Sequence, residues 1–267
     1  MKDITIIVPI HQYNDEVAER LKISLGSVVT NRKTYTNGKL IVRVICPPDI
    51  VTPLKDVVSS VLENEDFLII VNEGETDFCS QINECVKTIN TEHFSILEFD
   101  DMYTDKWFKM ANDYYFTNET VSLFIPINIL SDGSMHFQYA NEIAWSSVFS
   151  KKIGYLDYET LEEYSSFNLT GGIFNTNDFI EIGGLKPSIK ASFFYEFMLR
   201  LTKKELKIFV VPKEGYLHTI MREGSLSDIY SKTLTNKEID KWFELSKIEC
   251  NFKEDRGTTI SSDEILK

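Results

Sequence analysis

Residues 4–10 have the sequence Ile-Thr-Ile-Ile-Val-Pro-Ile, and this apolar run decides the fold class because a helical pattern follows it at once. From Asn14 onward, apolar residues recur at the spacing of one helix face, namely Val17, Leu21, Leu25 and Val28. A short apolar run followed by such a pattern predicts a buried β-strand that leads into an amphipathic helix.

The alternation of strand and helix continues through the first half of the chain. Further strands are predicted at residues 40–46, 67–71 and 93–99. Apolar residues at helical spacing follow the first two of these, and a helix around residues 107–115 is predicted after the third. Apolar strands joined by helices indicate parallel pairing, with helices on both faces of the sheet. We therefore expect an α/β domain with a Rossmann-like, mainly parallel, doubly wound sheet over residues 1–230, and a C-terminal helical extension over residues 231–267.

The second half of the chain has less regular patterns. They predict a hairpin, a helix, a strand and a capped helix: residues 121–130 with 135–143 around Asp132-Gly133, residues 192–204, residues 208–211, and the helix that begins at the capping-box pair Thr235 and Glu238.

Composition narrows the class of protein. Acidic residues outnumber basic ones 41 to 28, and the net charge of -13 disfavours nucleic acid as a partner without excluding it. The four cysteines lack C-x-x-C spacing and are expected to be reduced. We find neither a signal-peptide pattern nor a run of 18 apolar residues, so a cytoplasmic protein without a membrane span is expected.

Acidic residues follow the fourth predicted strand, in the order Glu98-Phe99-Asp100-Asp101. Ligands of α/β sheets bind at the carboxyl ends of the strands. Glu98 and Asp100 alternate with an apolar residue, so they share a face and can hold a divalent cation that bridges a diphosphate. The alternative interpretation is a solvated acidic loop, because carboxylates prefer exposure.

Short motifs follow one another along residues 3–230: Val8-Pro9, Asn83, Glu98 to Asp101, Thr170-Gly171-Gly172, Ile182-Gly183-Gly184-Leu185, Phe194-Tyr195-Glu196-Phe197, Leu199-Arg200, Tyr216-Leu217-His218 and Arg222. Their order is similar to that of family 2 glycosyltransferases with the GT-A fold. The resemblance implies an inverting, metal-dependent enzyme that transfers a sugar from a nucleotide-sugar donor, with UDP as the expected nucleotide.

The resemblance also implies a metal site. Asp100 would be the principal ligand of a D-x-D motif, Asp101 would support it, and His218 would complete the metal or diphosphate site. Glu98 stands where the family has its first Asp, and it is expected at the donor. Mixed oxygen and imidazole ligands favour Mn²⁺ over Mg²⁺.

By the same resemblance, Glu196 matches the catalytic base, which accepts the proton of the attacking acceptor hydroxyl. An ion pair with Arg200, four residues later on the same helix, is the alternative interpretation of Glu196.

Further residues are expected to contact the donor: Pro9, His11, Tyr13, Asn14, Asp49, Asn83, Gly171, Gly172 and Arg222. Asp49 follows Cys46-Pro47-Pro48, where the family has an Asp-Asp-Gly-Ser-like turn that contacts the base. Arg222 can bind a phosphate with two N–H groups or be an ordinary surface residue. The glycines allow close backbone approach or simple turns.

Two rival functions stay open. A nucleotidyltransferase would carry a Gly-rich basic loop after the first strand, and His11-Gln12-Tyr13-Asn14 matches such a loop poorly. A domain of the same fold that binds a nucleotide or a partner without catalysis is the second rival. The acceptor is unknown: a glycan or soluble sugar is favoured, and modified, hydroxymethylated viral DNA is the minority alternative.

Overall fold

The structure is a computed structural model, and it describes residues 1–63, 66–117, 120–132, 137–147, 149, 152–220 and 222–252. Its strands are β1 (Ile4–Pro9), β2 (Leu40–Cys46), β3 (Phe67–Val71), β4 (His93–Ile96), β5 (Met102–Tyr103), β6 (Val121–Ser131), β7 (Phe137–Ala140), β8 (Tyr155–Leu156), β9 (Ile173–Asn175) and β10 (Lys207–Thr219). They form one ten-stranded sheet in the order β3-β2-β1-β4-β9-β6-β10-β5, with β7 paired to β6 and β8 to β10.

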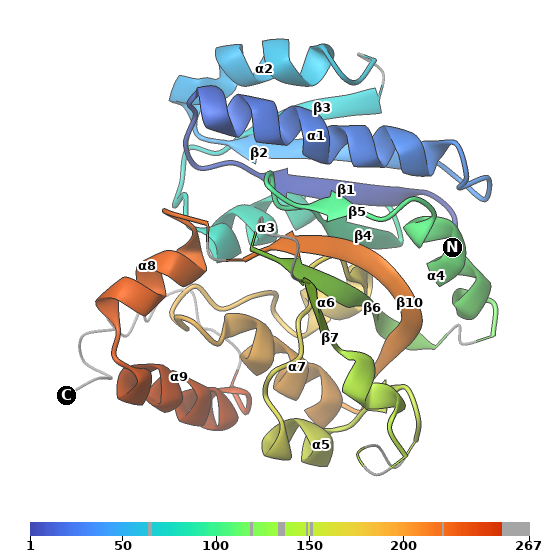
Figure 1. Cartoon of the computed structure of the whole chain (residues 1–267), viewed down its shortest axis with the longest axis vertical. Helices are drawn as coiled ribbons and strands as arrows, with labels where there is room; N and C mark the ends of the chain where they lie inside the picture. Colours follow the sequence, from blue (N-terminus) through green and yellow to red (C-terminus); the bar gives the residue numbers. More distant parts are fainter. Residues whose placement is uncertain are drawn as a thin grey trace.

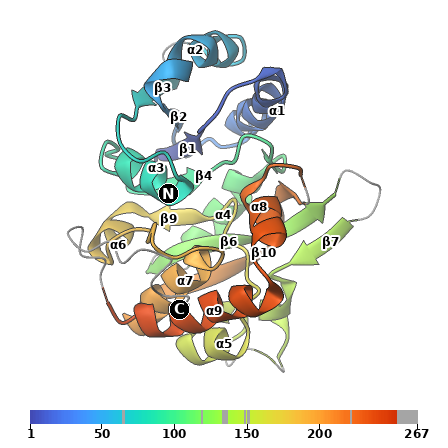
Figure 2. The same ribbon diagram turned by 90° about the vertical axis from the view of Figure 1, so that its left-hand side faces the viewer.

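Helices cover both faces of this sheet (Figures 1 and 2). They are α1 (Asp15–Arg32), α2 (Val51–Ser59), α3 (Phe78–Val86), α4 (Trp107–Tyr115), α5 (Tyr158–Glu163), α6 (Thr176–Glu181), α7 (Phe193–Lys203), α8 (Leu226–Thr233) and α9 (Asn236–Glu249), with short 3-10 helices at η1 (Pro48–Ile50) and η3 (Glu142–Trp145). Apolar residues of α1, α2 and α4 pack in one core, and those of α3, α5, α6, α7 and α9 pack in the other. Among the described residues, no helix combines the length and the apolar character that a membrane span requires.

The first four predicted strands pair as expected. β1 is parallel to β2 and to β4, and β2 is parallel to β3. All six residues of β1 are buried, because the sheet is covered on both faces there. The carboxyl ends of β1, β2, β3 and β4 therefore meet at one edge. The predicted α/β class is confirmed, although the short strand β9 between β4 and β6 is antiparallel to both and was not predicted.

Several predicted boundaries were wrong. β4 ends at Ile96 instead of residue 99, because the chain turns after Leu97 and the backbone N–H of Asp101 donates to the Glu98 carbonyl at 3.1 Å. β10 extends to Thr219, well beyond the predicted residues 208–211, since register shifts on both sides of Glu214 let pairing with β6 continue past Pro212.

The predicted hairpin and capped helix are confirmed. β7 pairs antiparallel with the end of β6, although residues 133–136 of the predicted turn and strand lie outside the described part of the chain. The second strand ends at Ala140, before η3. Thr235 and Glu238 form the capping box at the start of α9, and the fully buried Trp242 of α9 belongs to the core shared with α7.

Candidate functional site

Two distant parts of the chain meet at the carboxyl edge of the sheet. Ligand atoms of Glu98, Asp101 and His218 all lie within 4.8 Å of one another. His218 Nδ1 is 2.8 Å from Asp101 Oδ2, and the backbone N–H of Thr219 donates to Asp101 Oδ1 at 2.7 Å. The end of β10 thus supplies an imidazole to the acidic turn that follows β4. We call Glu98, Asp101 and His218 the acid–histidine cluster.

The scaffold beneath the cluster explains one predicted glycine. Tyr216 lies two residues before His218, and its hydroxyl oxygen accepts a hydrogen bond from the Glu98 backbone N–H at 3.1 Å. Gly171 has a φ of 73°, and a Cβ at this position would lie 2.4 Å from the Tyr216 ring. Trp107 fixes the same turn by donating from Nε1 to the Gly171 carbonyl at 2.9 Å. Gly171 is therefore required by packing beside the cluster.

Asp100, the predicted principal metal ligand, is engaged elsewhere. Its carboxylate accepts a hydrogen bond from Arg222 Nε, and its backbone carbonyl accepts one from the Thr219 hydroxyl at 2.7 Å. The Arg222 guanidinium also lies over the Phe99 ring, 4.9 Å from the centroid. Asp100 and Arg222 were each predicted near the donor, but their pairing was not predicted.

Mutual burial of these groups perturbs their protonation. Burial and then the nearby Asp101 raise the pKa of Glu98 to about 8. Burial also raises the pKa of Asp101, although the His218 hydrogen bond opposes that shift. For His218, burial would lower the pKa, but the Asp101 hydrogen bond and the surrounding carboxylates raise it to about 9. Crowded carboxylates disfavour each other's charge, and a nearby cation relieves that cost.

The acid–histidine cluster fits a divalent cation by its donor chemistry. Carboxylate oxygens together with imidazole nitrogen suit a metal such as Mn²⁺. Asp101 occupies Nδ1 of His218, so Nε2 is the nitrogen that can bind a metal, and a carboxylate behind a histidine is a common way to orient such a ligand. The cluster contains Glu98 in place of the predicted Asp100.

Glu196 lies in the second core, on α7. Its side chain is fully buried, and its two oxygens accept from Arg200 at 2.9 and 2.7 Å. Lys186 Nζ lies 3.0 Å from the same carboxylate. Arg200 also donates to the carbonyls of Ile182 and Gly184 at 2.6 and 2.8 Å. The pairing with Arg200 is thus confirmed, whereas a role as catalytic base stays a prediction that this geometry disfavours.

Several predicted donor residues have structural partners instead. Asn14 caps α1 by accepting from the Val17 N–H at 2.9 Å. Asn83 exchanges two hydrogen bonds with the backbone of Leu185, at 2.7 and 2.9 Å. A donor contact by either side chain would have to add to or replace these bonds.

The remaining predicted donor residues lie as follows. Pro9 is the buried last residue of β1, and His11 and Tyr13 follow it, with His11 exposed and Tyr13 half-buried. Gly172 is buried beside Gly171, and Asp49 is exposed in η1, directly after β2. Their donor contacts stay predictions.

Two contributing residues were missed in the sequence. Thr219 binds Asp101 through its backbone and Asp100 through its hydroxyl, and its only signal was its place directly after His218. Lys186 is 1% exposed and pairs with Glu196, but a lysine after a Gly-Gly turn gives no sign of burial.

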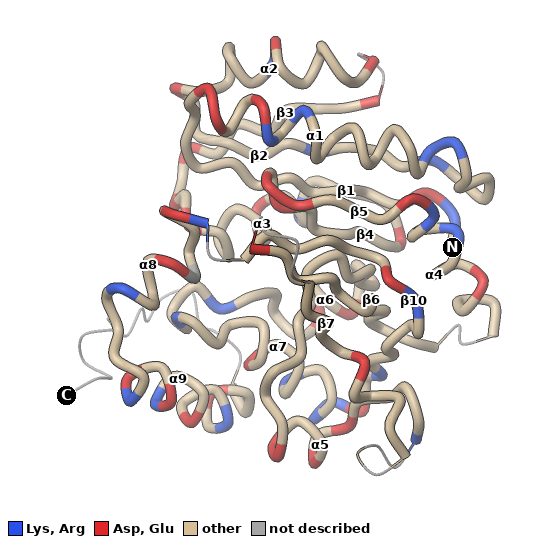
Figure 3. The backbone as a smooth tube through the Cα atoms, viewed as in Figure 1, with Lys and Arg blue, Asp and Glu red and all other residues tan. Residues whose placement is uncertain are grey.

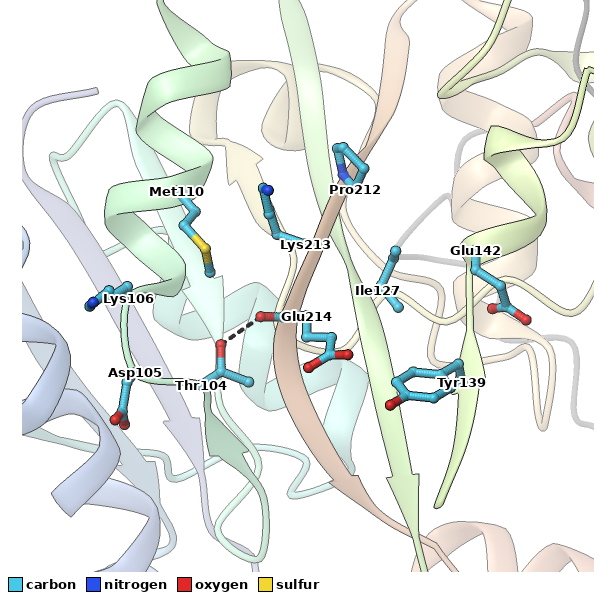
Figure 4. Close-up of a pocket in the computed structure, with 10 residues that line it drawn as sticks. All are labelled: Thr104, Asp105, Lys106, Met110, Ile127, Tyr139, Glu142, Pro212, Lys213 and Glu214. Atoms are coloured by element: carbon cyan, nitrogen blue, oxygen red, sulfur yellow. Dashed lines mark hydrogen bonds between the residues drawn. The ribbon is translucent and has the colours of Figure 1, made fainter.

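A groove of about 700 Å³ is lined in part by residues that are close in sequence to Asp101 and His218 of the acid–histidine cluster (Figure 4). It begins at Thr104, whose hydroxyl donates to the Glu214 carbonyl at 2.7 Å, and it extends to Tyr139 on β7. Tyr139 is half-exposed. Among the described residues that line the groove, none is a predicted site residue.

No protein-family model matches the chain, and no curated protein sequence matches it. Solved structures do match. TarS 1–349 of S. aureus in complex with UDP-GlcNAc is 14% identical, with a TM-score of 0.61, covering 96% of this chain and 75% of that chain. The mannosyltransferase PcManGT from Pyrobaculum calidifontis in complex with GDP-Man and Mn²⁺ is 9% identical, with a TM-score of 0.59, covering 93% of this chain and 70% of that chain. The chain therefore shares its mixed α/β fold with structures of glycosyltransferase type.

Proposed function

We propose that the protein is a glycosyltransferase that takes a sugar from a nucleotide-sugar donor and uses a divalent cation, Mn²⁺ or Mg²⁺. A UDP-sugar is the first donor to test. The observation that carries the proposal is the acid–histidine cluster at the carboxyl edge of the sheet. Ligands of such sheets bind at this edge. Fold alone does not decide function, so the proposal rests on the residues of the cluster.

The proposed roles follow from the contacts of each side chain. Glu98 and His218 hold the cation, and Asp101 orients His218 through the hydrogen bond to Nδ1. Arg222 binds the donor diphosphate, because its guanidinium is positioned at the same edge and matches phosphate geometry. A bound cation would neutralise the charge that develops on the departing nucleotide. Glu196 has no part in the proposed site.

A neutral glycan is the proposed acceptor. The net charge of -13 opposes a polyanion, and lysines are interspersed with Asp and Glu along α9 (Figure 3). The groove in Figure 4 offers the exposed Tyr139 ring among polar groups, which suits a sugar with one apolar face. A mobility shift on hydroxymethylated duplex DNA at stated salt would favour the DNA alternative.

A second candidate is nucleotide binding without transfer. The buried ion pairs of Glu196 favour it, because they engage the carboxylate that the family resemblance assigns to proton abstraction. Donor hydrolysis or transfer separates the two candidates.

Thermal unfolding with UDP or GDP, with and without Mn²⁺, tests the proposal. A ligand at about 100 times its Kd stabilises the folded state by about 2.7 kcal/mol, which raises the Tm by roughly 5–10 °C in a chain of this size. The shift should require Mn²⁺ and should fall in Glu98→Gln but not in Glu16→Gln, a matched change on the exposed face of α1. If neither diphosphate shifts the Tm, the proposal is wrong; if binding occurs but no nucleotide-sugar is hydrolysed or transferred, the second candidate is correct.

A further inference from the structure

The ion pair between Arg222 and Asp100 lies beside the acid–histidine cluster. Arg222 Nε donates to Asp100 Oδ2, and the two side chains are 13% and 7% exposed. The stacking of the guanidinium on Phe99 adds a second contact to the same turn, next to Asp100. This pair is therefore more shielded from solvent than an ordinary surface ion pair, and its energy is less screened.

Thr219, three residues before Arg222 in the sequence, is anchored to the acidic turn. Thr219 is fixed to the turn twice, through its N–H to Asp101 and its hydroxyl to the Asp100 carbonyl, both at 2.7 Å. Arg222 follows three residues later in the sequence and contacts Asp100 of the same turn. A side chain tethered in this way has a high local concentration at Asp100.

Acidic and basic side chains are crowded at this edge. The carboxyl groups of Glu98, Asp100 and Asp101 gather with two basic side chains, His218 paired to Asp101 and Arg222 paired to Asp100. A divalent cation bound to Asp100 would share this carboxylate with the Arg222 guanidinium. Like charges that contact one carboxylate repel strongly where water is partly excluded. A diphosphate would relieve this repulsion by offering Arg222 a stronger partner than Asp100.

We propose that Arg222 is an internal cation that competes with the divalent metal for Asp100 and that the donor diphosphate withdraws it. Asp100 then becomes available to the metal when the donor binds, so metal and diphosphate bind cooperatively. This inference rests on the proposed function, because it requires that both ligands bind at this edge. It gives Arg222 opposite effects on the two ligands: it weakens binding of the metal alone and strengthens binding of the diphosphate.

Calorimetric titration of wild-type protein and Arg222→Gln tests this assignment. Mn²⁺ alone should bind Arg222→Gln about tenfold more tightly than wild type, equivalent to removing about 1.4 kcal/mol of repulsion. UDP or GDP at saturating Mn²⁺ should bind the variant about 10-fold to 100-fold more weakly, because a charge-assisted hydrogen bond is lost. Arg20→Gln, which removes an exposed guanidinium paired to Glu16 on α1, should change neither affinity.

The outcomes separate the inference from the proposed function. If wild type binds neither Mn²⁺ nor a diphosphate, both fail. If wild type binds both but Arg222→Gln binds Mn²⁺ with equal or lower affinity, competition at Asp100 is excluded while the proposed function stands. Far-UV circular dichroism verifies that each variant is folded, and Arg222→Lys provides a second measure: it keeps the charge, so its Mn²⁺ affinity should stay near that of wild type.

Discussion

Two clusters of charged residues use the same chemistry in different surroundings. Glu196 is enclosed by Arg200 and Lys186, whose side chains are 4% and 2% exposed, and backbone carbonyls of the neighbouring turn take further donors of Arg200. The acid–histidine cluster lies at the sheet edge, where His218 is 22% exposed. The first cluster is closed by the protein itself, whereas the second has a histidine that solvent or a ligand can reach.

This difference separates structural from functional charge. A carboxylate whose partners are all supplied by the fold fixes elements relative to one another, here α7 and the turn before it. A carboxylate at an open edge keeps coordination sites for a ligand. Glu196 and Asp101 both have strong partners, so charge pairing alone does not distinguish the two clusters, and accessibility does.

Removing one partner from the closed cluster should give the largest effect. Glu196→Gln leaves Arg200 without its counter-charge in the core and leaves Lys186 with the more distant carboxylate of Glu249, at 3.8 Å. Removing one partner of a buried ion pair typically costs about 3–5 kcal/mol of unfolding free energy. Urea unfolding measures this loss. Diphosphate affinity per folded molecule should be unchanged; a variant with normal stability that loses transfer activity would restore Glu196 as catalytic base.

His93 extends the comparison, because it is a buried titratable group that has neither the ion pairs of Glu196 nor the open edge of the acid–histidine cluster. It is 1% exposed, and neither ring nitrogen has a hydrogen-bond partner among the residues that the structure describes. Burial lowers the pKa of His93 to about 4. Between pH 6.5 and 4, His93 binds a proton in the unfolded chain but stays neutral in the folded protein. The stability of the folded protein therefore falls as the pH falls, by on the order of 3 kcal/mol at pH 4.

The measurement is urea unfolding of wild type and His93→Phe at pH 7 and at pH 4.5. The variant should lose less stability between these pH values, because phenylalanine does not titrate and keeps an aromatic ring against Tyr115. Parallel losses in the two proteins would assign the acid sensitivity to other groups.

A smaller effect is expected at the open cluster. Asp101→Asn can still accept from the Thr219 N–H, but its amide would donate to His218 Nδ1 and favour a proton on Nε2. Loss of such an orienting carboxylate typically lowers metal affinity 10-fold to 100-fold. Mn²⁺ titration measures it, with Asp113→Asn on the exposed face of α4 as the matched control; equal affinities in wild type and Asp101→Asn would contradict the assigned role.

The smallest effect is expected at an exposed pair. Glu244→Gln breaks the contact with Lys247 on α9, where the glutamate is 72% exposed. Solvent-exposed pairs contribute about 0–1 kcal/mol, so urea unfolding should barely change. This variant is also the matched control for Glu196→Gln, and a loss comparable to that of Glu196→Gln would show that burial is not what distinguishes the two pairs.

Local pattern predicted the elements better than their ends. The apolar run at residues 4–10 and the helix spacing after it identified β1 and α1, because periodic burial is written into neighbouring residues. The extent of β10 and the existence of β9 depend on partners far along the chain. Strand pairing between segments that are far apart in the sequence leaves little trace in any short stretch of residues.

The site shows the same division. The sequence by itself determined that a run of acids follows the fourth strand and that an α/β sheet would present it at a ligand-binding edge. Only the tertiary structure decided which acids meet: it brings His218 to Asp101 across 117 residues, gives Arg222 to Asp100, and encloses Glu196 with Arg200 and Lys186. Residue type and spacing fix what a side chain can do, whereas its partners and its exposure are set by contacts between segments that the chain order does not relate.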